Sequence, residues 1–255
     1  MNNVPPLLSE KIIDRHRRWW VEKQPNPFKH LAGKMEGRKF AQEAGVEVPD
    51  LFMVLDNISD LPNFNCLPDS FVIKPVSGYS SKNVFPIRGN INMFTKELES
   101  RKNILEAVGS DSRKFIIEEM LVDHSRKPGV PDDYKFYCFG EGVAFFHIIE
   151  RNSIKDVSRN RHWFITPEWE LLKPRMQKTQ LPQGELPIKP ACYDALLADV
   201  RLLGRKLNMF MRIDMFATSR GPVFGEFTPQ PHGGRGYAAE GDAWMGALWK
   251  GEEGV

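Results

Sequence analysis

The stretch MRIDMFATSRGPVFGEFT, residues 211–228, predicts two antiparallel strands joined by a tight turn. Its two apolar halves flank a run of residues that favour turns, TSRGP. Because side chains alternate between the two faces of a strand, Arg212 and Asp214 share one face of the first strand. Glu226 and Thr228 share one face of the second strand for the same reason. The hairpin therefore gathers polar side chains on one surface.

A turn centred on Arg220 places Asp214 opposite Glu226, and Arg212 opposite Thr228. Two carboxylates directly opposite each other repel and weaken a sheet, unless a cation lies between them. Mg²⁺ prefers oxygen ligands and typically takes one or two carboxylates plus substrate phosphates. The pattern favours a Mg²⁺ site at this pair. The alternative is a surface hairpin in which one carboxylate pairs with Arg212.

Two apolar strands upstream end in polar segments that suit a nucleotide. The strand FVIKP, residues 71–75, carries Lys74 and leads into the hydroxyl-rich loop VSGYSS. A lysine and backbone N–H groups in such a place can hold phosphate oxygens, although the chain has no GxxxxGK[ST] motif. The strand at 115–117 leads into Glu118-Glu119-Met120-Leu121, which suits a hinge that meets adenine. Both patterns also fit ordinary strand ends at a surface.

The remaining elements predict an α+β fold. Apolar spacing and cap residues predict helices over residues 33–44, 92–108 and 191–207. A second hairpin is predicted over residues 134–150, with glycines at its bend. Strands and helices mix, with at least two hairpins, and this favours α+β layers over a strictly alternating parallel fold.

The sequence allows two interpretations for each of two further segments. The basic, Trp-containing residues 14–20 predict either a surface helix that packs Trp19 or Trp20 onto the body, or a nucleic-acid contact. Residues 151–190 predict either a lid or acceptor-binding excursion, or a solvated β excursion. They include His162 and are basic at Arg151, Lys155, Arg159 and Arg161.

Composition excludes several classes of protein. The chain has 255 residues, 41% of them hydrophobic, and a net charge of +2, which argues against a nucleic-acid or polybasic membrane partner. Three cysteines lie far apart, and no apolar run approaches the roughly 18 residues of a membrane span. Neither HExxH nor GxSxG occurs. We therefore expect a cytoplasmic globular protein.

Five segments in order resemble the ATP-grasp superfamily, and more closely its TupA-like branch, named after teichuronopeptide biosynthesis. They are HLAGKMEGRKFAQEAGVEVP, LPDSFVIKPVSGYSSKNV, FIIEEML, DDYKFYCFGEG and MRIDMFATSRGPVFGEFTPQPHGG. The resemblance runs from about residue 30 to residue 246. It implies two α+β subdomains that grip ATP. The implied organisation is a shortened N-terminal region at 1–66, a small subdomain with the phosphate loop at 67–121, and a large subdomain with the Mg²⁺ site at 122–255.

The resemblance also implies roles for particular residues. The implied ATP-binding positions, from the phosphate lysines through the loop and adenine hinge to the ribose site, are Lys34, Lys74, Ser77, Gly78, Ser80, Glu118, Glu119, Leu121, Asp133 and Lys135. The implied metal ligands are Asp214, Glu226 and Thr228. The implied catalytic positions are Lys74, Arg212, Arg235 and His232.

The chain departs from the family pattern in two ways. Thr228 stands where many ATP-grasp enzymes have asparagine, although the TupA-like branch shares the threonine. The segment before Lys34 is short for the usual N-terminal domain, so a partner subunit, a second copy of the chain or residues 151–190 would complete the acceptor site.

The implied activity is that of a carboxylate–amine ligase that uses ATP and Mg²⁺ and forms an acylphosphate. Its substrates would be a carboxylate and an amine from the amino acids, peptides or acidic saccharide precursors. Arg212 and Arg235 would stabilise the oxyanion, His232 would accept the amine proton, and Gly233-Gly234 would allow close backbone approach. The alternatives are a kinase that phosphorylates a small-molecule hydroxyl and a non-catalytic nucleotide-binding module.

Overall fold

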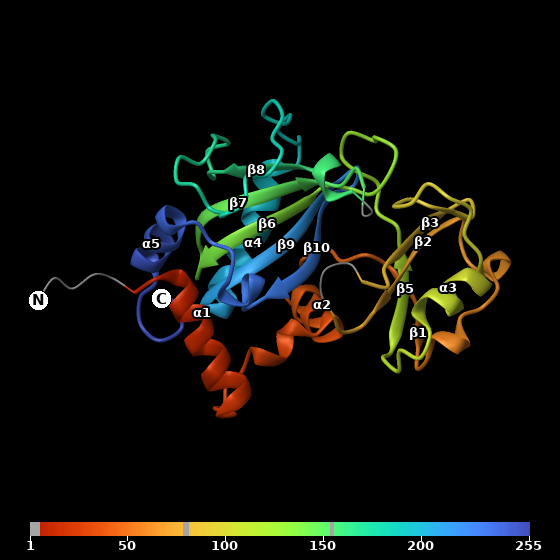
Figure 1. Ribbon diagram of the computed structural model, residues 1–255, viewed down its shortest axis with the longest axis horizontal. Helices are drawn as coiled ribbons and strands as arrows, with labels where there is room; N and C mark the ends of the chain where they lie inside the picture. Colours follow the sequence, from red (N-terminus) through yellow and green to blue (C-terminus); the bar gives the residue numbers. More distant parts are fainter. Residues whose placement is uncertain (1–5, 79–81, 154–155) are drawn as a thin grey trace, which may run out of the picture.

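Two five-stranded antiparallel sheets form two lobes in the computed structural model, which describes residues 6–78, 82–153 and 156–255 (Figure 1). The first sheet has the order β1-β5-β2-β3-β4, with β1 (Leu51–Leu55), β5 (Phe115–Glu119), β2 (Ser70–Pro75), β3 (Phe85–Arg88) and β4 (Ile91–Asn92). The second has the order β10-β9-β6-β7-β8, with β10 (Gly221–Thr228), β9 (Phe210–Thr218), β6 (Asp133–Phe139), β7 (Gly142–Glu150) and β8 (Arg161–Ile165). The expected α+β class is confirmed.

The first sheet buries one face against α3 (Arg101–Val108). Ile104 and Val108 of this helix pack on Phe71, Ile73 and other apolar residues of the strands. The edge strand β1 comes from residues 51–55 and pairs with β5. The small lobe therefore begins before residue 67, inside the stretch that we assigned to the N-terminal region.

The helix expected over residues 92–108 is wrong in its first half. The Asn92 side chain accepts hydrogen bonds from the backbone N–H groups of Phe94 and Thr95, which makes a turn. Lys96 then adopts a left-handed φ of 63°. Ser100 caps α3 by accepting from the backbone N–H of Asn103. Local side-chain hydrogen bonds thus outweigh the helical spacing of charges.

The second sheet buries one face against α4 (Tyr193–Leu207) and α2 (Lys34–Glu43). Met211, Ile213 and Met215 of β9 lie in this core, as their alternation predicts. Both helices end at left-handed residues: Asn208, with a φ of 44°, caps α4, and Gly45, with a φ of 84°, follows α2. These two predicted helices are confirmed within two residues.

One end of the opposite face is covered by α1 (Leu8–His16) and α5 (Ala239–Leu248) (Figure 1). Short helical turns lie at Arg17–Val21, Lys29–Ala32, Ile58–Asp60, Phe64–Cys66, Val157–Arg159 and Pro231–Gly234. The other end of this face carries polar side chains.

The N-terminal segment is a surface helix whose basic residues bind within the protein. Trp19 is 1% exposed and packs in the core, whereas Trp20 is 44% exposed. Arg15 is fully buried and donates to the carbonyl oxygen of Phe210 at 2.8 Å. Arg18 donates to the Glu253 carboxylate at 2.7 Å. The packing interpretation of residues 14–20 is confirmed, and these two arginines are engaged internally.

Within the described residues, no helix combines the length and apolar character needed to cross a membrane.

Candidate active site

A row of polar side chains crosses the face of the second sheet that lies opposite α4 and α2. Glu226 of β10 lies opposite Asp214 of β9, which lies opposite Lys135 of β6, which lies opposite His147 of β7. Neighbouring strands are about 4.8 Å apart, so these four side chains are direct neighbours on one surface. The predicted pairing of Asp214 with Glu226 is confirmed.

The pairing arises from a turn and a bulge together, and not from a turn centred on Arg220. Thr218 pairs with Gly221, so the loop has two residues. That register alone would set Asp214 opposite Gly225. A bulge between Phe224 and Glu226 absorbs one residue and brings Glu226 opposite Asp214. A Cβ on Gly225 would lie 3.0 Å from the Asp214 carbonyl oxygen, a tight contact that favours glycine at the bulge.

Two cations hold the Asp214 carboxylate. Arg212 donates to its two oxygens through Nε at 2.6 Å and Nη2 at 2.8 Å, and Lys135 Nζ lies 2.5 Å from Oδ2. Arg212 Nη2 also reaches Glu226 Oε1 at 3.4 Å. The predicted pairing of Arg212 with one carboxylate is thus present, but Asp214 is buried rather than at the surface.

The charges around Asp214 fix its protonation state. Burial raises the pKa of this carboxyl, but Arg212 and Lys135 oppose burial and hold the pKa below its usual value. The same pairing raises the pKa of Arg212, despite the opposing effect of its own burial. Asp214 is therefore ionised at neutral pH, and its two oxygens are held by these cations.

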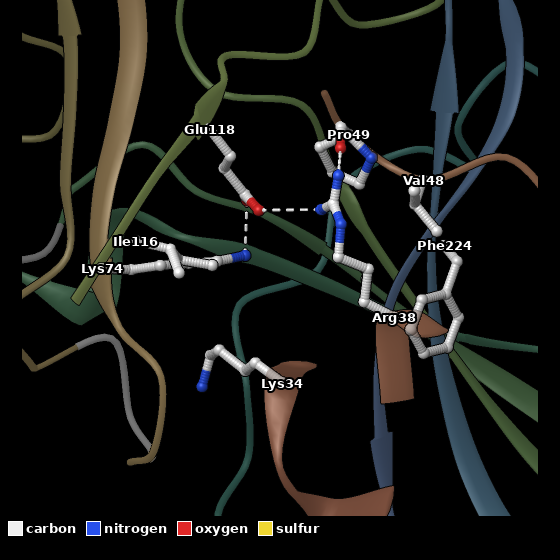
Figure 2. Close-up of a pocket in the computed structure, with 9 residues that line it drawn as sticks. Lys34, Arg38, Val48, Pro49, Lys74, Ile116, Glu118 and Phe224 are labelled. Atoms are coloured by element: carbon white, nitrogen blue, oxygen red, sulfur yellow. Dashed lines mark hydrogen bonds and ion pairs between the residues drawn. The ribbon is translucent and has the colours of Figure 1, made fainter. Parts of the chain in front are cut away.

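Side chains of the first sheet and of α2 form a differently composed group beside a narrow cavity (Figure 2). The buried Glu118 carboxylate lies between Lys74 Nζ, at 2.5 Å, and Arg38 Nη1, at 3.5 Å. Arg38 also donates to the carbonyl oxygen of Pro49. Two cations therefore share one carboxylate, which leaves a net positive charge beside the cavity.

Lys34 connects the two groups. It is the first residue of α2, and its Nζ lies 3.7 Å from Glu226 Oε2 and donates to the Gly78 carbonyl oxygen at 3.4 Å. Its backbone N–H donates to the carbonyl oxygen of Val76. Burial lowers the pKa of Lys34; the nearby Lys74 lowers it further, while Glu226 opposes the change. Lys34 therefore contacts both the second-sheet carboxylate and the loop after Lys74.

The two ends of the predicted phosphate loop are tied to one site before β5. Arg113 Nη1 donates to the Ser77 carbonyl oxygen at 2.5 Å, and its guanidinium pairs with Asp111. Asn83 donates to the same Asp111 carboxylate at 2.9 Å. Ser80, a predicted phosphate contact, lies outside the described residues.

Four further predicted positions are described by the structure, and two of them pair with arginines. Glu119 accepts from Arg220 Nη2 at 2.6 Å, and Asp133 pairs with Arg151 Nη2 at 2.5 Å. Leu121 is buried, and Thr228 is partly exposed opposite Arg212. Their predicted roles toward adenine, ribose and metal stay predictions.

The segment after β10 lies beside the polar row. His232 has a left-handed φ of 54°, and its partial withdrawal from water, with Arg212 and Lys135 nearby, lowers its pKa. Arg235 is exposed. The close approach expected at Gly234 is made to α1 instead, because a Cβ there would lie 2.8 Å from the Ser9 carbonyl oxygen.

The sequence analysis missed Arg38, Arg113 and His147 as members of the site. Arg38 follows Lys34 by four residues, so the two share a helix face. The predicted hairpin around Gly140–Gly142 already sets His147 opposite Lys135. Both signals were present in the sequence, whereas Arg113 depends on a contact between distant segments and has no local signal.

A family model described as TupA-like ATPgrasp matches residues 10–250. The D-Ala:D-Ser ligase VanG from Enterococcus faecalis is similar at 15% identity, with a TM-score of 0.50, over 88% of this chain and 59% of that one. A D-alanine–D-alanine ligase from Helicobacter pylori is 18% identical over 80% of this chain and 56% of that one, with a TM-score of 0.47. An L-amino acid ligase from Bacillus licheniformis is 15% identical over 87% of this chain and 47% of that one, with a TM-score of 0.47.

The chain spans roughly half of the length of these three proteins, between 47% and 59%. Among curated proteins there is no match. At such identities a structural likeness concerns the fold alone.

Proposed function

Because this chain belongs to the TupA-like ATP-grasp family, we propose that it is an ATP- and Mg²⁺-dependent carboxylate–amine ligase. One observation carries the proposal: Asp214 and Glu226 are paired in register, and Lys34 joins them to the cationic group around Lys74. Phosphoryl transfer depends mainly on positioning and charge neutralisation, and this arrangement supports both.

The donor set fits a Mg²⁺ ion. Asp214 and Glu226 offer hard carboxylate oxygens, both within reach of Arg212. Across the described part of the chain, no group of three or more histidine, cysteine, aspartate or glutamate residues could hold a metal by itself. Two carboxylates with the remaining ligands from phosphate and water is the usual Mg²⁺ arrangement in ATP sites. Bound there, the ion would neutralise charge on phosphate oxygens.

The first-sheet residues act on the phosphates in this proposal. Lys74 is held by Glu118, which positions its ammonium before nucleotide arrives. Lys34 would contact a second set of phosphate oxygens, since its amine already lies between Gly78 and Glu226. Arg113 holds the loop end at Ser77 and acts as a positioning residue.

The reaction would proceed in two steps. A substrate carboxylate oxygen forms a bond to the γ-phosphorus, the bond to the ADP oxygen breaks, and an acylphosphate results. An amine then attacks the acyl carbon, loses a proton and expels inorganic phosphate. Arg212 and Arg235 would stabilise the oxyanion. His232 would accept the proton, since its lowered pKa keeps the imidazole neutral near pH 7.

The products of ATP turnover test this proposal. Wild type would be supplied with ATP, Mg²⁺ and pools of amino acids, short peptides and uronic acids, and ADP and phosphate would be measured. Equal amounts of both, together with a hydroxamate when hydroxylamine replaces the amine, are expected with the productive pool. ADP without phosphate would indicate a kinase instead, and ATP binding without turnover in every pool would indicate a nucleotide-binding module.

Glu226→Gln is the preferred inactive control. The Glu226 side chain is 37% exposed, so its replacement perturbs folding less than a change at the buried Asp214. Circular dichroism of the variant checks that it remains folded.

A further inference from the structure

An open cavity of about 420 Å³ lies at the outer edge of the second sheet, apart from the two charged groups. His162 and Phe164 of β8 form one wall, and residues 171–183 form the others. The chain after β8 turns back along this edge, where Leu172 N–H donates to the Phe164 carbonyl oxygen and His162 N–H to that of Pro182. The volume falls within the range of about 300–1,000 Å³ that is typical of ligand sites.

The β8 wall of the cavity contacts the polar row of the second sheet through His162. His162 Nδ1 lies 3.0 Å from His147 Nε2. His147 lies opposite Lys135, whose amine contacts Asp214. The cavity is therefore joined to the proposed phosphoryl-transfer site through side chains of adjacent strands.

The opposite wall leads to the same site from the other side. Gln177 forms an isolated β-bridge with Tyr237, and Lys178 N–H donates to the carbonyl oxygen of Gly236. These partners directly follow Arg235 in the chain. A ligand that leaves the cavity along this bridge thus approaches Arg235 and His232.

The lining is cationic and rich in amides. Lys173 and Arg175 line the cavity, and no aspartate or glutamate does. Arg175 donates to the carbonyl oxygens of Gln177 and Lys178, which shapes the wall, and neither cation belongs to an ion pair found among the described residues. Three glutamine amides and a threonine hydroxyl also line the cavity: Gln177, Gln180, Gln183 and Thr179. The rest of the lining is mostly apolar: Phe164, Leu171, Leu172, Pro174, Met176 and Leu181. This chemistry suits an anionic ligand that has its own amide groups and some apolar surface.

The lining favours a peptide over a sugar acid. The side-chain amides of glutamine both donate and accept, and they match peptide groups in both roles. A sugar ring would gain from an open aromatic face, but both aromatic rings in the lining already lie against His147. The ring centroids of Phe164 and His162 are 4.3 Å and 5.2 Å from that of His147.

We propose that this cavity binds the carboxylate-bearing part of an acidic peptide, whose amino terminus is the amine joined by the ligase. The inference rests on the proposed function and adds the class of the amine substrate. The strands β7 and β6 separate β8 from β9, so the ligand must span about 14 Å, or roughly four extended residues. Its cationic contacts lie at the far end, and its amine reaches His232.

Direct binding tests this inference without turnover. The probe is a four-residue peptide of glycine and glutamate, titrated calorimetrically into the full chain with Mg²⁺ and a non-hydrolysable ATP analogue. Its counterpart with glutamine for glutamate and a tetramer of a uronic acid serve as comparison ligands. The acidic peptide is expected to bind most tightly of the three.

Two variants and a matched control locate the binding. Lys173→Glu reverses a charge in the lining and is expected to weaken binding roughly five- to tenfold. Thr179→Trp fills the cavity at an exposed position and is expected to weaken binding about tenfold or more. Lys178→Glu is the control, because this lysine is exposed in the same segment but does not line the cavity. Its binding is expected to stay within about twofold of wild type.

Equal effects of Lys173→Glu and Lys178→Glu would overturn the site, and tighter binding of the uronic acid would overturn the peptide class. The site is supported if Lys173→Glu and Thr179→Trp stay folded and bind the peptide more weakly while Lys178→Glu binds as wild type does. The peptide class is supported if the acidic peptide binds most tightly of the three ligands. Because ATP turnover is measured separately, an inactive protein that still binds the peptide at this cavity would contradict the proposed function and not the site.

Discussion

Two groups of charged side chains, joined by Lys34, differ in composition. The first-sheet group has one carboxylate, Glu118, between Lys74 and Arg38. The second-sheet group has two carboxylates, Asp214 and Glu226, with Arg212, Lys135 and Lys34 around them. The first group leaves unbalanced positive charge beside the cavity, and the second places two anionic oxygen donors in register.

Because of this difference, we expect Glu118 and Glu226 to have different roles. Glu118 is buried and holds two cations in place, so a phosphate that takes over Lys74 would replace its contact. Glu226 is partly exposed and is held more loosely, at 3.4 and 3.7 Å from its cations. In the proposed site, the first carboxylate orients cations and the second serves as a ligand.

The same substitution on the two sheets gives the largest expected contrast. Glu226→Gln should lower kcat for ATP turnover about a hundredfold or more, since removal of one fixed charge at a transition state costs on the order of 3 kcal/mol. Glu118→Gln should lower it less than about tenfold, because Lys74 keeps its charge. Steady-state ADP release measures both. Equal losses would erase the proposed difference between the groups.

Lys74→Met tests whether Lys74 binds phosphate or only balances the charge of Glu118. The dissociation constant for ATP should rise roughly tenfold to a hundredfold, because a charge-assisted contact is worth about 1.5–3 kcal/mol. The double variant Lys74→Met, Glu118→Gln should lose further thermal stability, because it leaves the buried Arg38 without its carboxylate, and it should not regain ATP affinity. Calorimetry and thermal unfolding read the two effects. Restored ATP affinity in the double variant would argue against phosphate binding by Lys74.

Gly225→Ala disturbs the bulge that builds the second-sheet group. The added Cβ would lie 3.0 Å from the Asp214 carbonyl oxygen, so we expect a loss of about 1–3 kcal/mol in unfolding free energy. Mg²⁺-dependent turnover should fall as well, whereas ATP affinity through Lys74 should change little. Gly184→Ala, at an exposed glycine with ordinary contacts, is the control. Unchanged stability in Gly225→Ala would mean that the bulge tolerates a side chain.

Asp132 lies in the connection between the two lobes, outside both groups, and gives the smallest expected effect. Burial raises its pKa to about 6, although Lys127 at 2.6 Å opposes the rise. Because the folded state binds the proton more tightly than the unfolded state, stability should increase as the pH falls from 7 to 5, by about 1 kcal/mol. Denaturant unfolding at both pH values measures this.

Asp132→Asn provides the comparison for that titration. The variant should lose this part of the pH dependence, while contributions from histidines remain in both proteins. Identical pH profiles for wild type and variant would show that Asp132 keeps an ordinary pKa.

Local patterns in the sequence predicted much of the second sheet. Alternation in β9 and β10 gave the shared face of Arg212 and Asp214, and the glycines around Glu141 predicted the β6–β7 hairpin. The register of Asp214 against Glu226 was also predicted, but its cause, a two-residue turn compensated by the Gly225 bulge, depends on a clash with the neighbouring strand and has no one-strand signature.

The first sheet was less predictable. β1 joins it through pairing with β5, which lies about sixty residues later in the chain, and no local pattern encodes such a partner. The short α3 reflects the capping by Ser100 and the turn at Asn92, which override helical spacing. The anchoring of the phosphate loop by Arg113 is equally non-local.

The transfer of oxygen from a carboxylate to phosphate tests the central claim most directly. Wild type would be incubated with ATP, Mg²⁺ and pooled amino acids and short peptides whose carboxylates carry ¹⁸O, and the released phosphate would be analysed by mass spectrometry. The ligase mechanism predicts one ¹⁸O atom in each phosphate, and turnover greatly reduced in Glu226→Gln. Phosphate that carries no ¹⁸O, at the same rate of ADP release, would contradict phosphoryl transfer to a carboxylate.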